Sequence, residues 1–200
     1  MREIVAVALA VTLSAASAAS QDVTEPKSGV AFAPKVGDMS LLGVGLRTKT
    51  MLKVKVYAVG LYVADSALAG PLAALKGKTD SPAFYRELVT GDFPKEIRLK
   101  FVRDLSAEQI QSAFREVLTA ADPAKTNLFV NYFGELKSGR EAVLHYSPGG
   151  NLEVSVAGLG KPPINDKKFS ESVFAIWLGD KPIQDDIKKA LVSRADQLLK

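Results

Sequence analysis

The chain has 200 residues, of which 47% are hydrophobic, and its formal net charge at pH 7 is +4. This length suits one domain with a sizeable core, and the scattered lysines and arginines form no basic stripe, so we expect no nucleic-acid partner. With no cysteine and one histidine, the chain lacks the side chains for a structural zinc site or a Cys–His nucleophile, and we expect no metal and no cofactor.

Residues 1–18 have the three parts of a secretory signal peptide. Arg2 lies beside the charged amino group, an apolar run covers residues 4–13, and Ala-Ser-Ala at residues 16–18 is a small-residue cleavage site. The apolar run is shorter than the about 20 residues that span a bilayer. We therefore expect export to a periplasm or the extracellular space, with no membrane span.

Residues 19–36 are rich in proline, lysine, glutamate and glycine, and this composition predicts an irregular lead-in. One domain is expected over residues 37–200. Its first part, residues 41–63, reads LLGVGLRTKTMLKVKVYAVGLYV. The apolar alternation predicts two antiparallel strands joined by a turn at residues 48–50.

The predicted strand pair contains a single arginine, Arg47. Burial of a guanidinium without a partner is costly, so this side chain is expected to hold an anion. The alternatives are that Arg47 pairs with an acidic side chain of the protein or emerges at a sheet edge. Alternation along the second strand would place Tyr57 on the same face as Lys53 and Lys55. Arg47 and Tyr57 should lie close enough on neighbouring strands to share a ligand.

Two other features of the sequence give weaker evidence for a functional site. Gly43 and Gly45 resemble the start of a dinucleotide-binding loop, but the third glycine and the following helix are missing. His145 falls within a predicted strand, where we expect it to be packed or at a rim.

The remaining elements follow from periodicity and turn residues. Ser106 and Gln109 have the spacing of a capping box, and a Pro-Gly-Gly-Asn sequence predicts a hairpin turn. Strands that pair as hairpins, with helices segregated from them, indicate an α+β fold with an antiparallel sheet covered on one face by helices. The later strands are expected at residues 97–101, 140–147 and 152–157, and the helices at 106–122, 124–136, 169–178 and 183–199.

Four segments occur in a familiar order: GVGLR, KVKVYAVGLYV, YSPGGNLEVSVAG and FAIWLGDKPI. Together they resemble the chalcone isomerase family, and in particular its noncatalytic, fatty-acid-binding branch. The resemblance extends from about Glu25 to the C-terminus. It implies an open-faced β-sandwich with a ligand cleft between the sheet and the helices.

In the isomerases of this family, an arginine stabilises the anionic phenolate of the substrate, while a threonine and a tyrosine organise water at the ketone. The resemblance matches Arg47 to that arginine and places Tyr57 at the threonine position and Ile110 at the tyrosine position. Two further polar contacts fall on Val117 and Ile176. The implied ligand-binding residues are Arg47, Tyr57, Ile110, Phe114, Val117 and Ile176.

Compared with the cleft of the isomerases, such a cleft would retain the arginine and lack most of the other polar groups. Each oriented donor that is lost costs about 2.7 to 4 kcal/mol of transition-state stabilisation. This argument favours a binding protein for a fatty acid or a similar amphiphilic carboxylate.

Two alternatives stay open. The first is an intramolecular lyase of the chalcone–flavanone isomerase type, with Arg47 as electrostatic catalyst and Tyr57 as a donor. The second is an interaction module whose cleft is filled core and whose protein partner the sequence does not identify.

Overall fold

The structure is a computed structural model that describes residues 21–49 and 52–200. The predicted signal peptide at residues 1–18 and the end of the predicted turn at residues 48–50 lie outside the described residues. The strands are β1 (Val23–Thr24), β2 (Ala31–Phe32), β3 (Lys35–Val36), β4 (Met39–Lys49), β5 (Val54–Ala64), β6 (Lys95–Phe101), β7 (Glu141–Ser147), β8 (Asn151–Val156), β9 (Leu159–Gly160) and β10 (Ile164–Asn165). The helices are α1 (Asp65–Leu68), the 3-10 turn η1 (Ala73–Leu75), α2 (Pro82–Thr90), α3 (Ala107–Val117), α4 (Pro123–Val130), α5 (Lys167–Leu178), α6 (Asp185–Ala190) and α7 (Ala195–Leu198).

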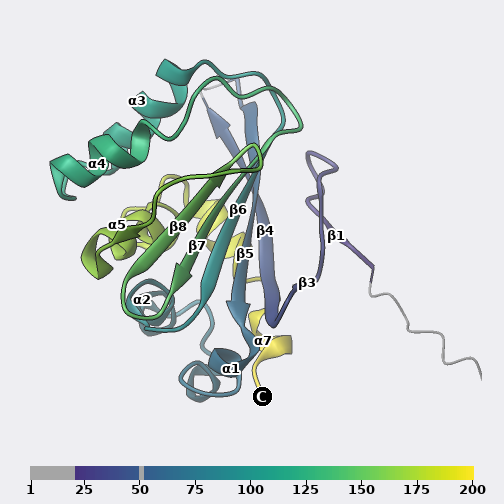
Figure 1. The fold of residues 1–200 in the computed structure, drawn as a ribbon. Coiled ribbons are helices and arrows are strands. Elements are labelled where there is room, and N and C mark those ends of the chain that lie inside the picture. The colour runs from purple at the N-terminus through teal and green to yellow at the C-terminus, as the bar shows by residue number, and fades with distance from the viewer. Residues whose placement is uncertain (1–20, 50–51) are drawn as a thin grey trace, which may run out of the picture.

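One antiparallel sheet organises the fold. Within the described residues it has eight strands, in the order β10-β8-β7-β6-β5-β4-β3, with β9 beside β8. The larger helices lie on one face of this sheet, and the N-terminal segment lies on the other (Figure 1). The predicted α+β arrangement, with helices covering one face of an antiparallel sheet, is confirmed.

The main core lies between the sheet and the helices. Trp177 and Phe174 of α5 and Phe129 of α4 are fully buried there. Aromatic edges pack on aromatic faces, as between Phe129 and Phe169, whose ring centroids are 6.0 Å apart. This packing fixes the helices against the strands that carry the site.

Helix α3 begins as its sequence predicts. The Ser106 hydroxyl accepts a hydrogen bond from the backbone N–H of Gln109, and the Gln109 side chain accepts one from the backbone N–H of Ser106. These two bonds satisfy amide groups that the first helical turn leaves without partners. The helix ends at Val117, earlier than predicted.

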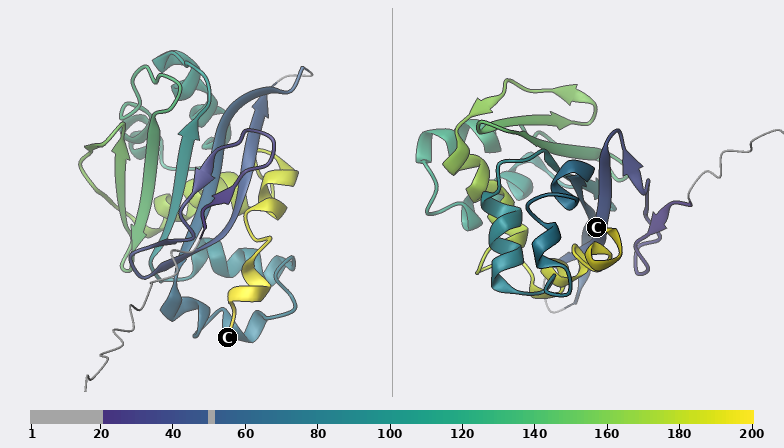
Figure 2. Two further views of the ribbon diagram at one scale, coloured as in Figure 1. Left: turned by 90° about the vertical axis from the view of Figure 1, so that its right-hand side faces the viewer. Right: turned by 90° about the horizontal axis from the view of Figure 1, so that it is seen from below.

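The lead-in that the composition predicts to be irregular contains short strands. β1 pairs with β2, and β3 pairs with the start of β4. This segment crosses the sheet face opposite the helices (Figure 2). Phe32 is fully buried in a second small core, and it packs where Gly60 leaves room, since a Cβ on Gly60 would lie 2.8 Å from its ring.

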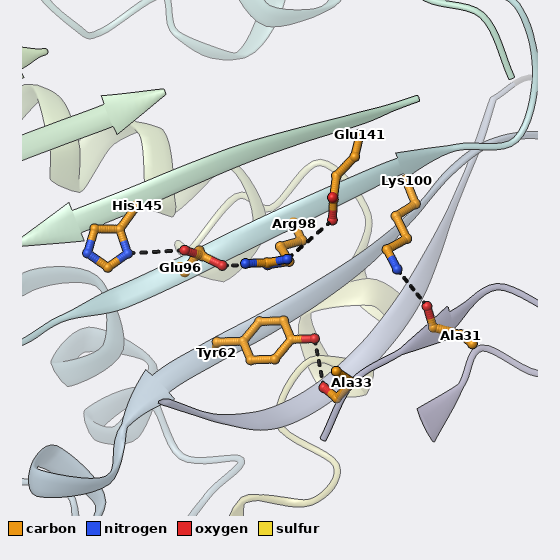
Figure 3. Close-up of polar contacts among 8 residues, drawn as sticks. All are labelled: Ala31, Ala33, Tyr62, Glu96, Arg98, Lys100, Glu141 and His145. Carbon is orange, nitrogen blue, oxygen red and sulfur yellow. Dashed lines mark hydrogen bonds and ion pairs between the residues drawn. The ribbon is translucent and has the colours of Figure 1, made fainter. Parts of the chain in front are cut away.

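Hydrogen bonds from the sheet hold the same segment. The Tyr62 hydroxyl donates to the carbonyl oxygen of Ala33, and Lys100 Nζ donates to that of Ala31, each at 2.8 Å (Figure 3). The Lys100 ammonium also lies 4.7 Å from the centre of the Phe32 ring, a cation–π distance. The outer face of the sheet is therefore partly covered.

Two predicted helices are shorter in the structure because their backbones bond elsewhere. The helix predicted at residues 124–136 ends at Val130, because Leu136 exchanges backbone hydrogen bonds with Leu105. The helix predicted at residues 183–199 is divided into α6 and α7, because the backbone N–H of Arg194 donates to the carbonyl oxygen of Leu42 on β4. In both places tertiary pairing overrides helical periodicity.

Over the part of the chain that the structure describes, no helix has the length and apolar character needed to cross a bilayer. The same residues contain no group of three or more His, Cys, Asp or Glu side chains placed to hold a metal ion.

Candidate functional site

A cleft of about 350 Å³ opens between the end of the sheet and helix α3. Its volume falls at the lower end of the range for small-molecule sites. The apolar wall comes from β5, β6 and α3, with Ile183 ahead of α6. The lining residues are Arg47, Lys49, Val54, Val56, Tyr57, Phe101, Arg103, Leu105, Gln109, Ile110, Ala113, Phe114, Glu116, Val117 and Ile183.

A β-bulge shapes the strand side of the cleft. Arg47 pairs with Tyr57, whereas Thr48 pairs with Lys55, so Val56 is an extra residue on β5. Because of this insertion, both Val56 and Tyr57 line the cleft. Lys55 instead donates from Nζ to the carbonyl oxygen of Lys27 in the N-terminal segment. The prediction that Lys55 shares a face with Tyr57 is therefore wrong.

Arg47 brings the positive charge that the sequence predicts. Its side chain is half-buried, and Nη1 donates to the carbonyl oxygen of Thr48 at 2.7 Å and to Oε1 of Gln184 at 3.1 Å. Among the residues that the structure describes, no carboxylate forms an ion pair with it. The guanidinium is oriented by neutral oxygens and keeps an uncompensated charge beside the cleft.

Gln184 holds that guanidinium in place. It is the residue before α6, and its Oε1 also accepts from the backbone N–H of Thr48 at 3.1 Å. Its Nε2 lies 3.4 Å from the carbonyl oxygen of Leu46. One amide side chain thus joins the start of α6 to β4 at Arg47. No local pattern in the sequence signals this contact, because the two residues are 137 positions apart.

Tyr57 supplies a neutral hydroxyl beside the cation. Burial raises the pKa of Tyr57 to about 12, although the hydrogen bond from Trp177 and the charge of Arg47 oppose this shift. The hydroxyl oxygen accepts from Trp177 Nε1 at 3.1 Å, and among the described residues its own proton has no acceptor. A ligand oxygen in the cleft could therefore accept a hydrogen bond from Tyr57.

Helix α3 forms the opposite wall. Ile110, Phe114 and Val117 all line the cleft, and Val117 is 37% exposed. Ile176 does not line it: this side chain is buried in the main core, while the adjacent Trp177 contacts Tyr57. Five of the six residues proposed from the sequence therefore meet at one cleft, and their binding role stays a prediction.

Charged residues at the cleft include some that the sequence analysis missed. Lys49 at the end of β4 and Arg103 after β6 both line it, together with one acidic residue, Glu116. Positive charges thus outnumber negative ones among the lining residues. This balance favours an anionic ligand over a cationic one.

Comparison with known proteins finds similarity over most of this chain. A family model described as chalcone isomerase-like matches residues 29–193. Chalcone–flavanone isomerase 1 of Fragaria ananassa is 27% identical over 203 residues, covering 86% of this chain and 86% of that protein. Fatty-acid-binding protein 1 of Arabidopsis thaliana is 26% identical over 205 residues, covering 90% of this chain and 72% of that protein.

A solved structure shares the fold. The crystal structure of an Arabidopsis thaliana fatty-acid binding protein superposes with a TM-score of 0.77 at 22% identity, covering 90% of this chain and 99% of that one. The family model spans most of the described residues, including β4, β5, β6 and α3, which line the cleft. The chain therefore belongs to the chalcone isomerase-like family.

Proposed function

We propose that this protein binds a fatty acid or a similar amphiphilic carboxylate in the cleft, with Arg47 as the anchor for the carboxylate. The observation that carries this proposal is the Arg47 guanidinium itself, which is half-buried at an apolar cleft without an ion pair to any described residue. A similar protein named fatty-acid-binding protein 1 supports the same ligand class.

The tail and the carboxylate of a bound fatty acid would contribute differently to its binding free energy. Each buried methylene contributes roughly 0.8 kcal/mol, so ten methylenes give about 8 kcal/mol before the costs of association. A charge-assisted hydrogen bond from Arg47 adds about 1.5 to 3 kcal/mol, and the Tyr57 proton offers a second donor. The tail supplies most of the affinity, while Arg47 sets the register of the ligand.

Laurate titration tests the anchor. Arg47→Ala should weaken laurate binding by roughly 10- to 150-fold, the ratio that corresponds to losing about 1.5 to 3 kcal/mol. Arg86→Ala, which removes an exposed arginine of α2, is the matched control and should bind like the wild type. Equal laurate affinity in Arg47→Ala and Arg86→Ala would contradict the proposal. Mass spectrometry of an organic extract of the purified protein would identify the natural ligand.

The N-terminal sequence supports a further proposal, export after removal of residues 1–18. The basic, apolar and small-residue segments follow one another in the order that a signal peptidase substrate requires. N-terminal sequencing of protein recovered from outside the cytoplasm should begin at Ala19. Protein that stays in the cytoplasm and begins at Met1 would contradict export.

A second candidate function is an intramolecular lyase reaction of the isomerase type. The neutral Tyr57 hydroxyl beside the Arg47 cation favours it, because such a pair could stabilise a developing oxyanion, and a chalcone–flavanone isomerase is among the similar proteins. Loss of chalcone absorbance above the buffer rate, abolished in Arg47→Lys, would support the enzyme, since lysine lacks the planar fork of arginine. Chalcone loss no faster than in buffer, together with tight laurate binding, would contradict the lyase function and support the binding function.

A further inference from the structure

Two rows of side chains cross the strand wall of the cleft. In the inner row, Arg47 of β4, Tyr57 of β5 and Phe101 of β6 are paired across neighbouring strands. In the outer row, Lys49 of β4 is paired with Val54 of β5. All five residues line the cleft. The strand wall therefore has an inner part and an outer part.

Arg103 joins the outer row from the other side of β5. The backbone N–H of Val102 donates to the carbonyl oxygen of Val56 at 3.1 Å, so the chain continues alongside β5 beyond the end of β6. The next residue, Arg103, lines the cleft. Because β5 lies between β6 and β4 in the sheet, Arg103 and Lys49 approach the outer part of the cleft from opposite sides.

The two parts of the cleft differ in burial. Tyr57 and Phe101 are buried and belong to the main core, whereas Lys49 and Arg103 are exposed. The core therefore closes the cleft behind the inner row. A ligand whose carboxylate is held at Arg47 must extend its chain toward the outer row.

The outer cations have no charge partner within the protein. Over residues 21–49 and 52–200, neither Lys49 nor Arg103 forms an ion pair. Glu116 of α3 also lines the cleft, but it forms no ion pair with them. A ligand with a single carboxylate at Arg47 would therefore leave the outer part of the cleft with a positive charge.

This arrangement favours a second anionic group at the far end of the ligand. A methyl-terminated tail would end beside two cations that need their hydration. An anionic group there would form charge-assisted hydrogen bonds with those cations. Lys49 is two residues beyond Arg47 on β4, a separation of roughly 7 Å along the strand, and a bound chain spans this distance easily.

We propose that the preferred ligand is an amphiphile with two anionic groups, one held by Arg47 and the other by Lys49 and Arg103. An acyl chain with a carboxylate at each end has this chemistry. The inference rests on the proposed function, since it assigns the first carboxylate to Arg47.

Matched ligand pairs test the second anion site. Calorimetric titration would compare octanedioate, decanedioate and dodecanedioate with the monocarboxylate of the same carbon number. For at least one length, the dicarboxylate should bind the wild type more tightly than its monocarboxylate. A cleft without a second anion site predicts the opposite, because exchanging a terminal methyl for a carboxylate loses about fourfold in affinity from the apolar carbon alone.

Charge-removing variants test the residues assigned to this site. In the double variant Lys49→Gln/Arg103→Gln, the ratio of dicarboxylate to monocarboxylate affinity should fall roughly two- to thirtyfold, as expected for two exposed ion pairs. The matched control is Lys78→Gln/Arg115→Gln, because both residues are exposed and neither lines the cleft. The control should keep the ratio of the wild type.

The outcomes separate this inference from the proposed function. Dicarboxylates that bind more weakly than the matched monocarboxylates at every length would overturn the second anion site and leave the proposed function in place. An affinity ratio that is equal in the two double variants would do the same. Wild-type protein that binds neither series would overturn the proposed function as well.

Discussion

The indole nitrogen of Trp177 donates a hydrogen bond to the hydroxyl oxygen of Tyr57, with Nε1 and the oxygen 3.1 Å apart. Trp177 is fully buried on α5 and Tyr57 is nearly so on β5. The bond therefore joins a core helix to the strand that lines the cleft. It leaves the Tyr57 proton as the group that a ligand oxygen could use.

Replacing the tyrosine tests both roles of this bond. Tyr57→Phe should lower the free energy of unfolding by about 1 to 3 kcal/mol, because the buried indole N–H loses its acceptor. Laurate affinity should fall as well. Urea denaturation and laurate titration measure the two effects. Tyr85→Phe is the control: the Tyr85 hydroxyl is buried without a partner in the described structure, so its removal should cost no stability. Equal unfolding free energies and equal laurate affinities in Tyr57→Phe and Tyr85→Phe would contradict this role of Tyr57.

Gln184→Glu should weaken laurate binding while the fold is retained. The new carboxylate would keep the oxygen that accepts from Arg47 Nη1 and from the backbone N–H of Thr48, and it would neutralise the guanidinium from inside the protein. The laurate dissociation constant should rise roughly tenfold or more. Gln197→Glu, an exposed change on α7, should leave it unchanged. Unaltered binding by Gln184→Glu would show that Arg47 does not hold the carboxylate.

The two glycines of the GVG segment, Gly43 and Gly45, should differ in how well they tolerate substitution by alanine. A Cβ on Gly43 would lie 2.1 Å from the carbonyl oxygen of Ala190 and 2.7 Å from the carbonyl carbon of Leu191, whereas the nearest atoms to a Cβ on Gly45 are 3.4 Å away. Gly43→Ala should therefore cost about 1 to 3 kcal/mol in unfolding free energy, and Gly45→Ala should cost less. Thermal unfolding of the pair decides this. Equal stabilities would mean that α6 does not approach β4 this closely.

A histidine on the outer face predicts a pH dependence. His145 Nδ1 lies 3.1 Å from Oε2 of Glu96, and the other carboxylate oxygen of Glu96 accepts a hydrogen bond from Arg98 Nε (Figure 3). The hydrogen bond to Glu96 raises the pKa of His145, although burial opposes the shift. Nearby Glu153 and Asp38 act in the same direction as Glu96.

A raised pKa means that the folded state binds this proton more tightly than the unfolded state does. The stabilising contribution is complete below about pH 6.5, the unfolded value, and it is lost as pH rises through the folded pKa. Urea denaturation across this interval should show that the stability of the wild type, measured relative to that of His145→Gln, falls as the pH rises. Identical profiles would contradict the interaction.

Local features of the fold could be predicted from the sequence. The capping box of α3 and the β7–β8 hairpin depend on residues close together in the chain, so spacing alone identifies them. That Arg47 and Tyr57 lie on neighbouring strands also follows from one turn, although β4 extends through Thr48 and Lys49, where the sequence predicts that turn. These are the features for which local preference and tertiary packing agree.

The remaining parts of the site depend on contacts that spacing does not encode. Gln184 and Trp177 reach Arg47 and Tyr57 across 137 and 120 positions of the chain. The bulge at Val56 interrupts a regular alternation without any glycine or proline to mark it. The family resemblance implies that Ile176 contacts the ligand, but adjacent residues on a helix point about 100° apart, and it is Trp177 that contacts the site.

The carboxylate of the ligand reports most directly on the proposed anchor. Carbon-13 NMR of laurate labelled at its carboxyl carbon can follow the ionisation of the bound headgroup during a pH titration. Pairing with Arg47 should keep the bound carboxylate ionised to a lower pH than in Arg47→Ala. A bound headgroup that titrates identically in both proteins would contradict the assignment of Arg47 as the anchor.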